Sequence, residues 1–130
     1  MRILIAEDDF ASRIFLFKFL STYGECDLTV DGMEAAEAFL LAHDMGKPYD
    51  LICLDIMMPK VNGIKALKAI RDIEKQKGIK DMNSVKVIMT TALNDTESIQ
   101  NSFNTGCEAY ASKPIDTVKF IEVMKKLELI

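Results

Sequence analysis

The chain of 130 residues has few of the side chains that build disulfide frameworks or zinc sites. Its three cysteines, Cys26, Cys53 and Cys107, are an odd number without a CxxC spacing, which indicates neither kind of site. The single histidine, His43, falls in an expected helix away from the expected strand ends, so it is interpreted as a surface residue. This thiol content favours a reducing cytoplasm.

Runs of basic residues and long apolar segments are also missing. With a net charge of −4 and a pI near 5.0, the sequence offers no clustered basic stripe for nucleic acid, so a protein partner is expected. No apolar stretch approaches the length that spans a membrane, and no basic and apolar leader precedes a cleavage site. We therefore expect a cytoplasmic protein without a membrane partner.

What the sequence does have is enough apolar material for one packed domain over residues 1–130, since 49% of its residues are hydrophobic. Apolar runs alternate with longer stretches of helical periodicity. The expected strands cover residues 3–6, 27–30, 51–54, 85–90 and 109–112, and the expected helices cover residues 10–23, 32–45, 63–77, 95–105 and 117–129.

This alternation predicts an α/β fold, a doubly wound parallel sheet of five strands with helices on both faces. Residues 51–54 and 87–89 are continuously apolar, as expected of strands buried on both sides. Ligands of such sheets bind beyond the carboxyl ends of the strands. Five side chains fall at those ends: Asp8, Asp9, Asp55, Thr91 and Lys113.

Each of these residues also has an ordinary interpretation. The acidic residues 7–9 suit the N-terminus of the following helix, and Asp55 precedes a turn sequence. Thr91 is a common strand residue, and Lys113 is a plausible solvated charge. Their joint occurrence at one sheet edge is harder to explain by capping and turns, so a common site is the favoured interpretation.

Carboxylates gathered at one edge oppose one another's ionisation unless a cation is present. Hard oxygen ligands without histidine or cysteine indicate magnesium or manganese rather than zinc or copper, and Mg²⁺ is favoured. A phosphorylated partner then places its phosphoryl group against Asp55 as nucleophile, while Lys113 and the Thr91 hydroxyl share the transferred charge. The expected product is an aspartyl phosphate.

Four segments carry a family resemblance that spans essentially the whole chain. They are ILIAEDD at residues 3–9, DIMMPKVNG at 55–63, MTTA at 89–92 and YASKP at 110–114. In this order they resemble the signature segments of response-regulator receiver domains of two-component signalling, including the single-domain chemotaxis and phosphorelay types.

The resemblance implies that Asp55 accepts a phosphoryl group from a phosphohistidine of a sensor histidine kinase or histidine phosphotransfer protein. It implies direct Mg²⁺ binding by Asp9, Asp55 and the Met57 carbonyl, and binding through water by Asp8. Lys113 and Thr91 would contact the phosphoryl oxygens.

The family fold is flavodoxin-like, with strand order 2-1-3-4-5 and often a cis bond at Lys113–Pro114. Thr91 and Tyr110 match the family's switch positions. Such a chain catalyses only its own phosphorylation and dephosphorylation, and it signals to a downstream protein as a monomer or a phosphorylation-dependent homodimer.

Two surfaces are expected to meet partners. The helix that includes residues 94–102 is unusually polar, so we expect it to be reshaped on phosphorylation together with the Tyr110 strand and the last helix, unless it is merely solvated. The first helix is apolar around most of its circumference. Ile14 and Phe15 are candidates for docking the donor helical bundle, the alternative being burial beneath a neighbouring helix.

Met57 and Leu93 are apolar positions near the acceptor that are expected to limit the approach of water and lengthen the life of the phosphoryl group. A haloacid-dehalogenase-type phosphatase is a rival interpretation, but it usually has an acid where this chain has Met57. A flavin-binding electron carrier is another, although residues 7–9 would repel its phosphate.

Overall fold

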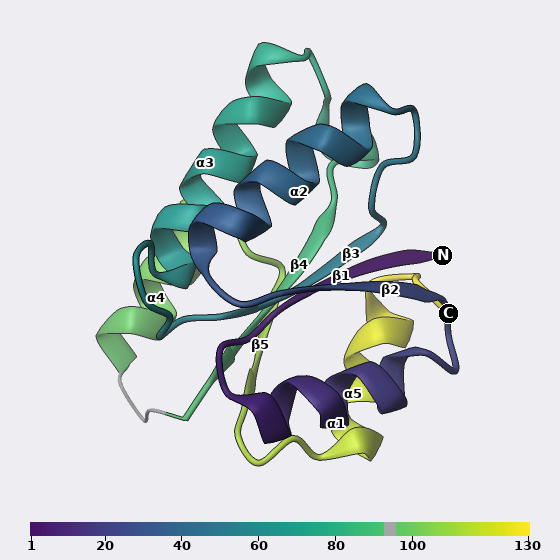
Figure 1. The fold of residues 1–130 in the computed structure, drawn as a ribbon, viewed down its shortest axis with the longest axis vertical. Helices are drawn as coiled ribbons and strands as arrows, with labels where there is room; N and C mark the ends of the chain where they lie inside the picture. Colours follow the sequence, from purple (N-terminus) through teal and green to yellow (C-terminus); the bar gives the residue numbers. More distant parts are fainter. Residues whose placement is uncertain (93–95) are drawn as a thin grey trace.

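The computed structural model describes residues 1–92 and 96–130, which form a five-stranded sheet and five α-helices (Figure 1). The strands are β1 (Arg2–Ala6), β2 (Glu25–Thr29), β3 (Leu51–Asp55), β4 (Lys86–Thr91) and β5 (Ala109–Ser112). The helices are α1 (Phe10–Leu20), α2 (Gly32–Asp44), α3 (Gly63–Gln76), α4 (Thr96–Thr105) and α5 (Thr117–Lys126), with a short 3₁₀ helix at Asp81–Asn83.

All neighbouring strands pair in parallel, in the order β2-β1-β3-β4-β5. Helices α2, α3 and α4 cover one face of the sheet, and α1 and α5 cover the other (Figure 1). The predicted doubly wound fold and strand order are therefore confirmed. This topology brings the carboxyl ends of β1, β3, β4 and β5 to one edge.

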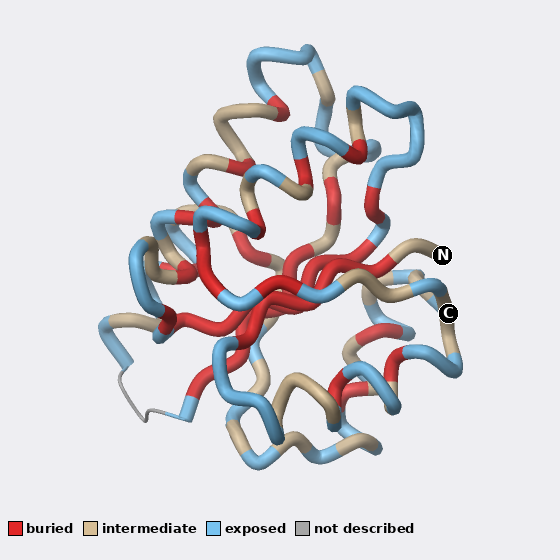
Figure 2. Tube along the Cα trace, in the orientation of Figure 1, coloured by how far each residue is buried: buried red, intermediate tan, exposed pale blue. Residues whose placement is uncertain are grey.

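The core is divided by the sheet into two clusters, and the central strands are buried on both faces (Figure 2). All five residues of β3 are buried, as its continuous apolar pattern predicts. Within the part of the chain that the structure describes, none of the helices has the combined length and hydrophobicity needed to cross a bilayer.

Several element ends differ from the sequence prediction. Helix α1 ends at Leu20 rather than residue 23, and α5 ends at Lys126 rather than residue 129. The apolar side chains Tyr23, Leu127 and Leu129 still pack against the core from turns, so hydrophobic periodicity continues beyond the last helical residue. Residue 95, predicted as the start of a helix, lies outside the described residues.

The amino ends of β4 and β5 are joined to α3 through Arg71. Its guanidinium donates to the carbonyls of Val85 and Gly106 and to the carboxylates of Glu74 and Glu108, at 2.7–3.0 Å. Glu74 and Glu108 in turn accept backbone N–H bonds from the start of β4. We call this group the Arg71 clamp; it lies at the edge opposite the predicted site.

Candidate functional site

Strand register places the acidic side chains side by side. Ala6 of β1 is opposite Leu54 of β3, so Glu7, the next residue after β1, follows the strand beside Asp55. Both side chains continue the α1/α5 face, because residues two positions earlier, Ile5 and Cys53, lie in that core cluster. Glu7 is fully buried and Asp55 is 4% exposed.

An acidic cluster results at this edge. Carboxylate oxygens of Glu7, Asp8 and Asp55 lie within 4.8 Å of one another, a grouping found among the described residues. Asp9 is not part of it, because its carboxylate accepts a hydrogen bond from the Ser12 backbone N–H at 2.9 Å and caps α1. The structure thus differs from the predicted metal set: Glu7 takes the position that was expected of Asp9.

A sequence signal for this exchange exists. Strand side chains alternate between faces, and Ile3, Ile5 and Glu7 keep the same phase, as do residues 51, 53 and 55 in β3. Asp9 comes after the strand and three residues before Ser12, which is the N-cap spacing. The capping interpretation of residues 7–9 is thus observed for Asp9.

Lys113 supplies the positive charge of the site. Its ammonium forms an ion pair with Glu7 Oε1 and lies 3.2 Å from Asp55 Oδ2. The other Asp55 oxygen, Oδ1, accepts a longer hydrogen bond of 3.4 Å from the Met57 backbone N–H. Lys113 is positioned by β5 and by its own N–H, which donates to the Thr91 carbonyl at 2.8 Å.

Burial and charge alter the acidity of these groups. Burial, followed by the hydrogen bond and charge of Glu7, raises the pKa of Asp55 to about 7 against the opposing effect of Lys113. Burial alone would lower the pKa of Lys113, but its bonds to Glu7 and Asp55 outweigh burial and raise it. The pKa of Asp9 is lowered, chiefly by the Ser12 backbone N–H. In the metal-free site, ionisation of the Asp55 carboxyl group therefore costs free energy.

The loop after Asp55 is held close to it by the start of α3. Asn62 caps α3 by accepting from the Lys65 N–H, and the Gly63 N–H donates to the Ile56 carbonyl at 2.8 Å. A Cβ at Gly63 would lie 2.0 Å from the Asp55 carbonyl oxygen, so only glycine permits this approach. Met57, which is 62% exposed, therefore lies in the loop beside Asp55.

The predicted switch residues lie on neighbouring strands. Thr91 is buried at the end of β4. Tyr110 of β5 is 43% exposed and makes an edge contact with Phe103 of α4, with ring centroids 6.1 Å apart. The peptide bond between Lys113 and Pro114 is cis, as the resemblance implied.

A small apolar hollow of about 270 Å³ adjoins the acidic cluster between α1 and the turn after β5. Phe15, Leu16, Pro114 and Ile115 line it together with Lys113. Phe15 is 43% exposed, so it is not buried beneath a neighbouring helix. Ile14, the other predicted docking residue, is only half-buried and does not line the hollow.

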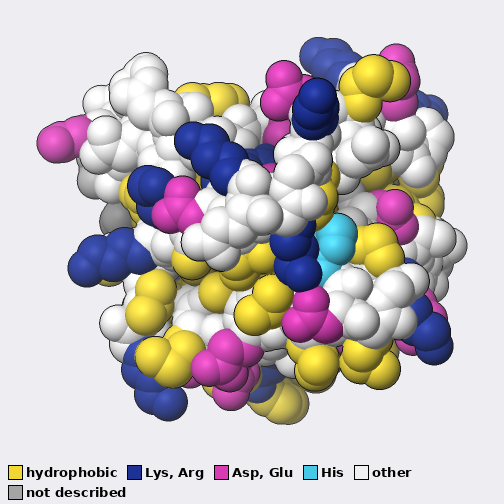
Figure 3. Space-filling model, turned by 90° about the horizontal axis from the view of Figure 1, so that it is seen from above, with side chains coloured by type: hydrophobic (Ala, Val, Ile, Leu, Met, Phe, Trp, Pro, Cys, Tyr) yellow, Lys and Arg dark blue, Asp and Glu magenta, His cyan; other side chains and the backbone are white. Residues whose placement is uncertain are grey.

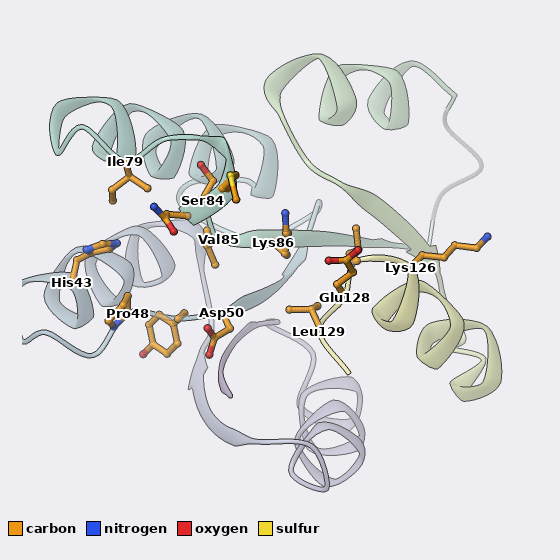
Figure 4. Close-up of a pocket in the computed structure, with 14 residues that line it drawn as sticks. His43, Pro48, Asp50, Ile79, Ser84, Val85, Lys86, Lys126, Glu128 and Leu129 are labelled. Atoms are coloured by element: carbon orange, nitrogen blue, oxygen red, sulfur yellow. The ribbon is translucent and has the colours of Figure 1, made fainter.

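A larger hollow, of about 740 Å³, lies at the opposite end of the strands, where His43, Asp50 and Lys86 point toward it (Figure 4). None of the acidic cluster lines it. His43 makes an edge contact with Phe39, consistent with a surface packing role. On the face seen in Figure 3, basic and acidic side chains are interspersed around this histidine rather than gathered by sign.

Comparison with curated proteins finds relatives that are longer than this chain. The response regulator protein VraR of Staphylococcus saprophyticus is 25% identical over 97% of this chain. The hybrid signal transduction histidine kinase L of Dictyostelium discoideum is 32% identical over 96% of it. The chain spans 56% of the first protein and 7% of the second.

Solved structures give the same fold. A chain of the CheX-CheY-BeF3-Mg complex from Borrelia burgdorferi has a TM-score of 0.83 at 25% identity, with 98% of this chain and 89% of that chain covered. The receiver co-crystal of Saccharomyces cerevisiae Ypd1 with Ssk1 gives 0.81 at 27% identity, covering 100% and 92%. The family model of the response regulator receiver domain matches residues 3–125. The chain therefore belongs to the response regulator receiver domain family of two-component signalling.

Proposed function

We propose that residues 1–130 form a phosphorylation-dependent switch in which Asp55 accepts a phosphoryl group from a phosphohistidine. The observation that carries this proposal is the convergence of buried Asp55 with the Lys113 ammonium at 3.2 Å and with two further carboxylates. A buried carboxylate, a fixed cation and a cluster of hard oxygens are what in-line phosphoryl transfer to an acid requires.

In the proposed reaction an Asp55 oxygen attacks phosphorus as the bond from phosphorus to the donor imidazole nitrogen breaks. The electron pair of that bond returns to the imidazole, which leaves as the neutral base after taking a proton. Lys113 moves from Asp55 to the phosphoryl oxygens, and Thr91 at the end of β4 approaches them. Asp55 must be ionised to attack, so its raised pKa favours transfer at neutral or higher pH.

The acidic cluster fits a bound Mg²⁺, because it offers three carboxylates, one fully buried, and neither imidazole nor thiolate. Glu7, Asp8 and Asp55 would hold the ion, with the Met57 carbonyl as a further oxygen ligand. Asp9 is not among the proposed ligands, because its carboxylate caps α1. When bound, the ion supplies positive charge that offsets the carboxylates and the transferred phosphoryl oxygens.

The donor partner in this proposal is a histidine kinase or a histidine phosphotransfer protein. The yeast co-crystal pairs a receiver domain with the phosphotransfer protein Ypd1, which supports that class. The apolar hollow beside Lys113, with Phe15 on its wall, is the surface that would receive the donor's helices. Output then passes by protein contact from α4, β5 and α5, where Tyr110 lies.

Intact-mass measurement after incubation with acetyl phosphate tests the proposal. We expect a Mg²⁺-dependent gain of one phosphoryl group in the native chain and none in Asp55→Asn. A chain that stays unmodified with both acetyl phosphate and a phosphorylated histidine donor would reject Asp55 as an acceptor. Sustained turnover of a phosphate ester would instead favour a phosphatase.

A further inference from the structure

Strand β4 ends in two threonines, and only Thr91 has a part in the proposed function. Thr90 is 1% exposed, and its Oγ1 has no hydrogen-bond partner among the described residues. A buried hydroxyl without a partner destabilises a fold, whereas valine would fill nearly the same space without that cost. The Thr90 hydroxyl is therefore a polar group without a structural role in this state.

Strand register places Thr90 beside the acceptor. In the β3 and β4 register, Thr90 lies directly opposite Asp55. Both belong to the α1/α5 face, since Cys53 and Ile88, two residues earlier in each strand, lie in that cluster. Because β4 lies between β5 and β3, the Lys113 side chain crosses the carboxyl end of β4 to reach Asp55.

The absence of a bond to Asp55 also has a local reason. Both carboxylate oxygens of Asp55 already have donors, Met57 N–H at Oδ1 and the Lys113 ammonium at Oδ2. Phosphorylation of Asp55 changes this, because the proposed function moves Lys113 to the phosphoryl oxygens. The Asp55 carboxyl group then lacks its strongest donor, and Thr90 is the neighbouring hydroxyl in register.

We propose that the Thr90 hydroxyl donates a hydrogen bond to Asp55 during hydrolysis of the aspartyl phosphate, and so shortens the life of the phosphorylated state. This inference rests on the proposed function. In that step a water oxygen bonds to phosphorus while the bond between phosphorus and the Asp55 oxygen breaks. The electron pair stays on Asp55, the water proton passes to solvent, and orthophosphate leaves. A donor to Asp55 stabilises the returning negative charge.

The test follows decay of the phosphorylated mass after acetyl phosphate is removed, in the presence of Mg²⁺. Thr90→Val is expected to decay about 3- to 10-fold more slowly than the native chain, the size of one neutral hydrogen bond. Thr90→Ser keeps the donor and is expected to decay at nearly the native rate. Thr29→Val is the matched control, because the Thr29 hydroxyl already bonds the Ile5 carbonyl at 3.1 Å, away from Asp55.

Urea unfolding separates this role from a packing effect. Thr90→Val is expected to unfold at higher urea than the native chain, and Thr29→Val at lower urea, while only the former changes decay. Native and Thr90→Val decaying equally would overturn the inference and leave the proposed function standing. If Thr90→Ser also decays slowly, the slower decay comes from the changed shape of the side chain rather than from loss of the hydroxyl, and the inference is overturned. A native chain that takes up no phosphoryl group would overturn both.

Discussion

Among single residues, Asp55 bears the sharpest conflict between burial and charge. Its unfolded-state pKa is near 3.8 and its folded pKa about 7, so between these values the folded chain binds more protons than the unfolded one. The contribution of Asp55 to the stability of the metal-free protein therefore falls as pH rises from about 4 to 7. The proposed Mg²⁺ would relieve the same conflict at neutral pH.

We therefore predict that Asp55→Asn, which removes the charge and keeps the shape, stabilises the metal-free protein at pH 8 by about 1–4 kcal/mol. Urea unfolding at pH 5 and pH 8 checks this, and the gain is expected to shrink at pH 5. Adding Mg²⁺ should raise the native chain's midpoint more than the variant's. A variant less stable than the native chain at pH 8 would contradict the prediction.

The exchange of Glu7 and Asp9 gives a second prediction at this scale. Glu7→Gln is expected to weaken Mg²⁺ binding about tenfold or more, because it removes a charged oxygen ligand from the acidic cluster. Asp9→Asn is its matched control: asparagine still caps α1, so affinity should change less than about threefold. Calorimetric titration with Mg²⁺ measures both. Greater loss in Asp9→Asn would restore the ligand set inferred from sequence.

Sequence alone located Asp55, Thr91 and Lys113 correctly at one edge, because each lies at the carboxyl end of a strand-like run: Asp55 and Thr91 end buried strands, and Lys113 follows the partly exposed edge strand β5. It expected Asp9 where the described acidic cluster has Glu7, because three successive acids satisfy both a metal site and a helix cap. Strand phase separates the two roles only once the end of β1 is known to within one residue.

At the scale of elements, α1 serves both core and surface. Phe19 packs edge-on against Phe120 of α5, with centroids 5.6 Å apart, whereas Phe15 and Phe17 are exposed. Of these two exposed rings, only Phe15 lines the hollow beside Lys113. The helix therefore offers a matched pair of variants for the docking surface.

Phe15→Glu is expected to slow phosphoryl transfer from a phosphorylated histidine protein by about tenfold or more, and to leave transfer from acetyl phosphate nearly native. Phe17→Glu changes the same helix outside the hollow and should spare both reactions. Rates are measured by intact mass over time. Equal loss with both donors in Phe15→Glu would indicate damage to the site rather than to docking.

Helix ends were the least predictable features at this scale. Periodicity extended α1 and α5 by about one turn, because Tyr23, Leu127 and Leu129 pack inward from non-helical backbone. Glu128, two residues after the end of α5, has a positive φ of 61°, and a pattern of apolar residues does not predict such a conformation. Packing side chains and helical hydrogen bonds need not stop at the same residue.

For the whole molecule, the Arg71 clamp joins α3 to the amino ends of β4, which ends at Thr91, and β5, which directly precedes Lys113. Arg71→Met is expected to lower the free energy of unfolding by about 3–5 kcal/mol, because it leaves Glu74 and Glu108 without their cation in a largely buried position. Lys68→Met breaks the exposed pair with Asp72 and should cost less than about 1 kcal/mol. Urea unfolding of both variants checks this. Similar losses in the two variants would mean that burial does not strengthen the ion pairs of the Arg71 clamp.

Strand order followed from the resemblance, while alternation of elements alone gave only a parallel sheet with helices on both faces. The clamp itself was not foreseen. In the sequence, nothing distinguishes Arg71, Glu74 and Glu108 from other charged residues. Only the folded structure shows that the Arg71 guanidinium contacts both carboxylates.

Both chain ends lie beside the amino edge of the sheet, away from the acidic cluster (Figure 1). Met1 and Leu129 pack against the same core cluster, and Leu129 lines the hollow that includes Asp50. A further polypeptide attached at either end would start from that edge and leave the acceptor open to a donor. The chain spans 56% of VraR and 7% of the hybrid kinase, so each of these relatives has further sequence beyond the part that it matches.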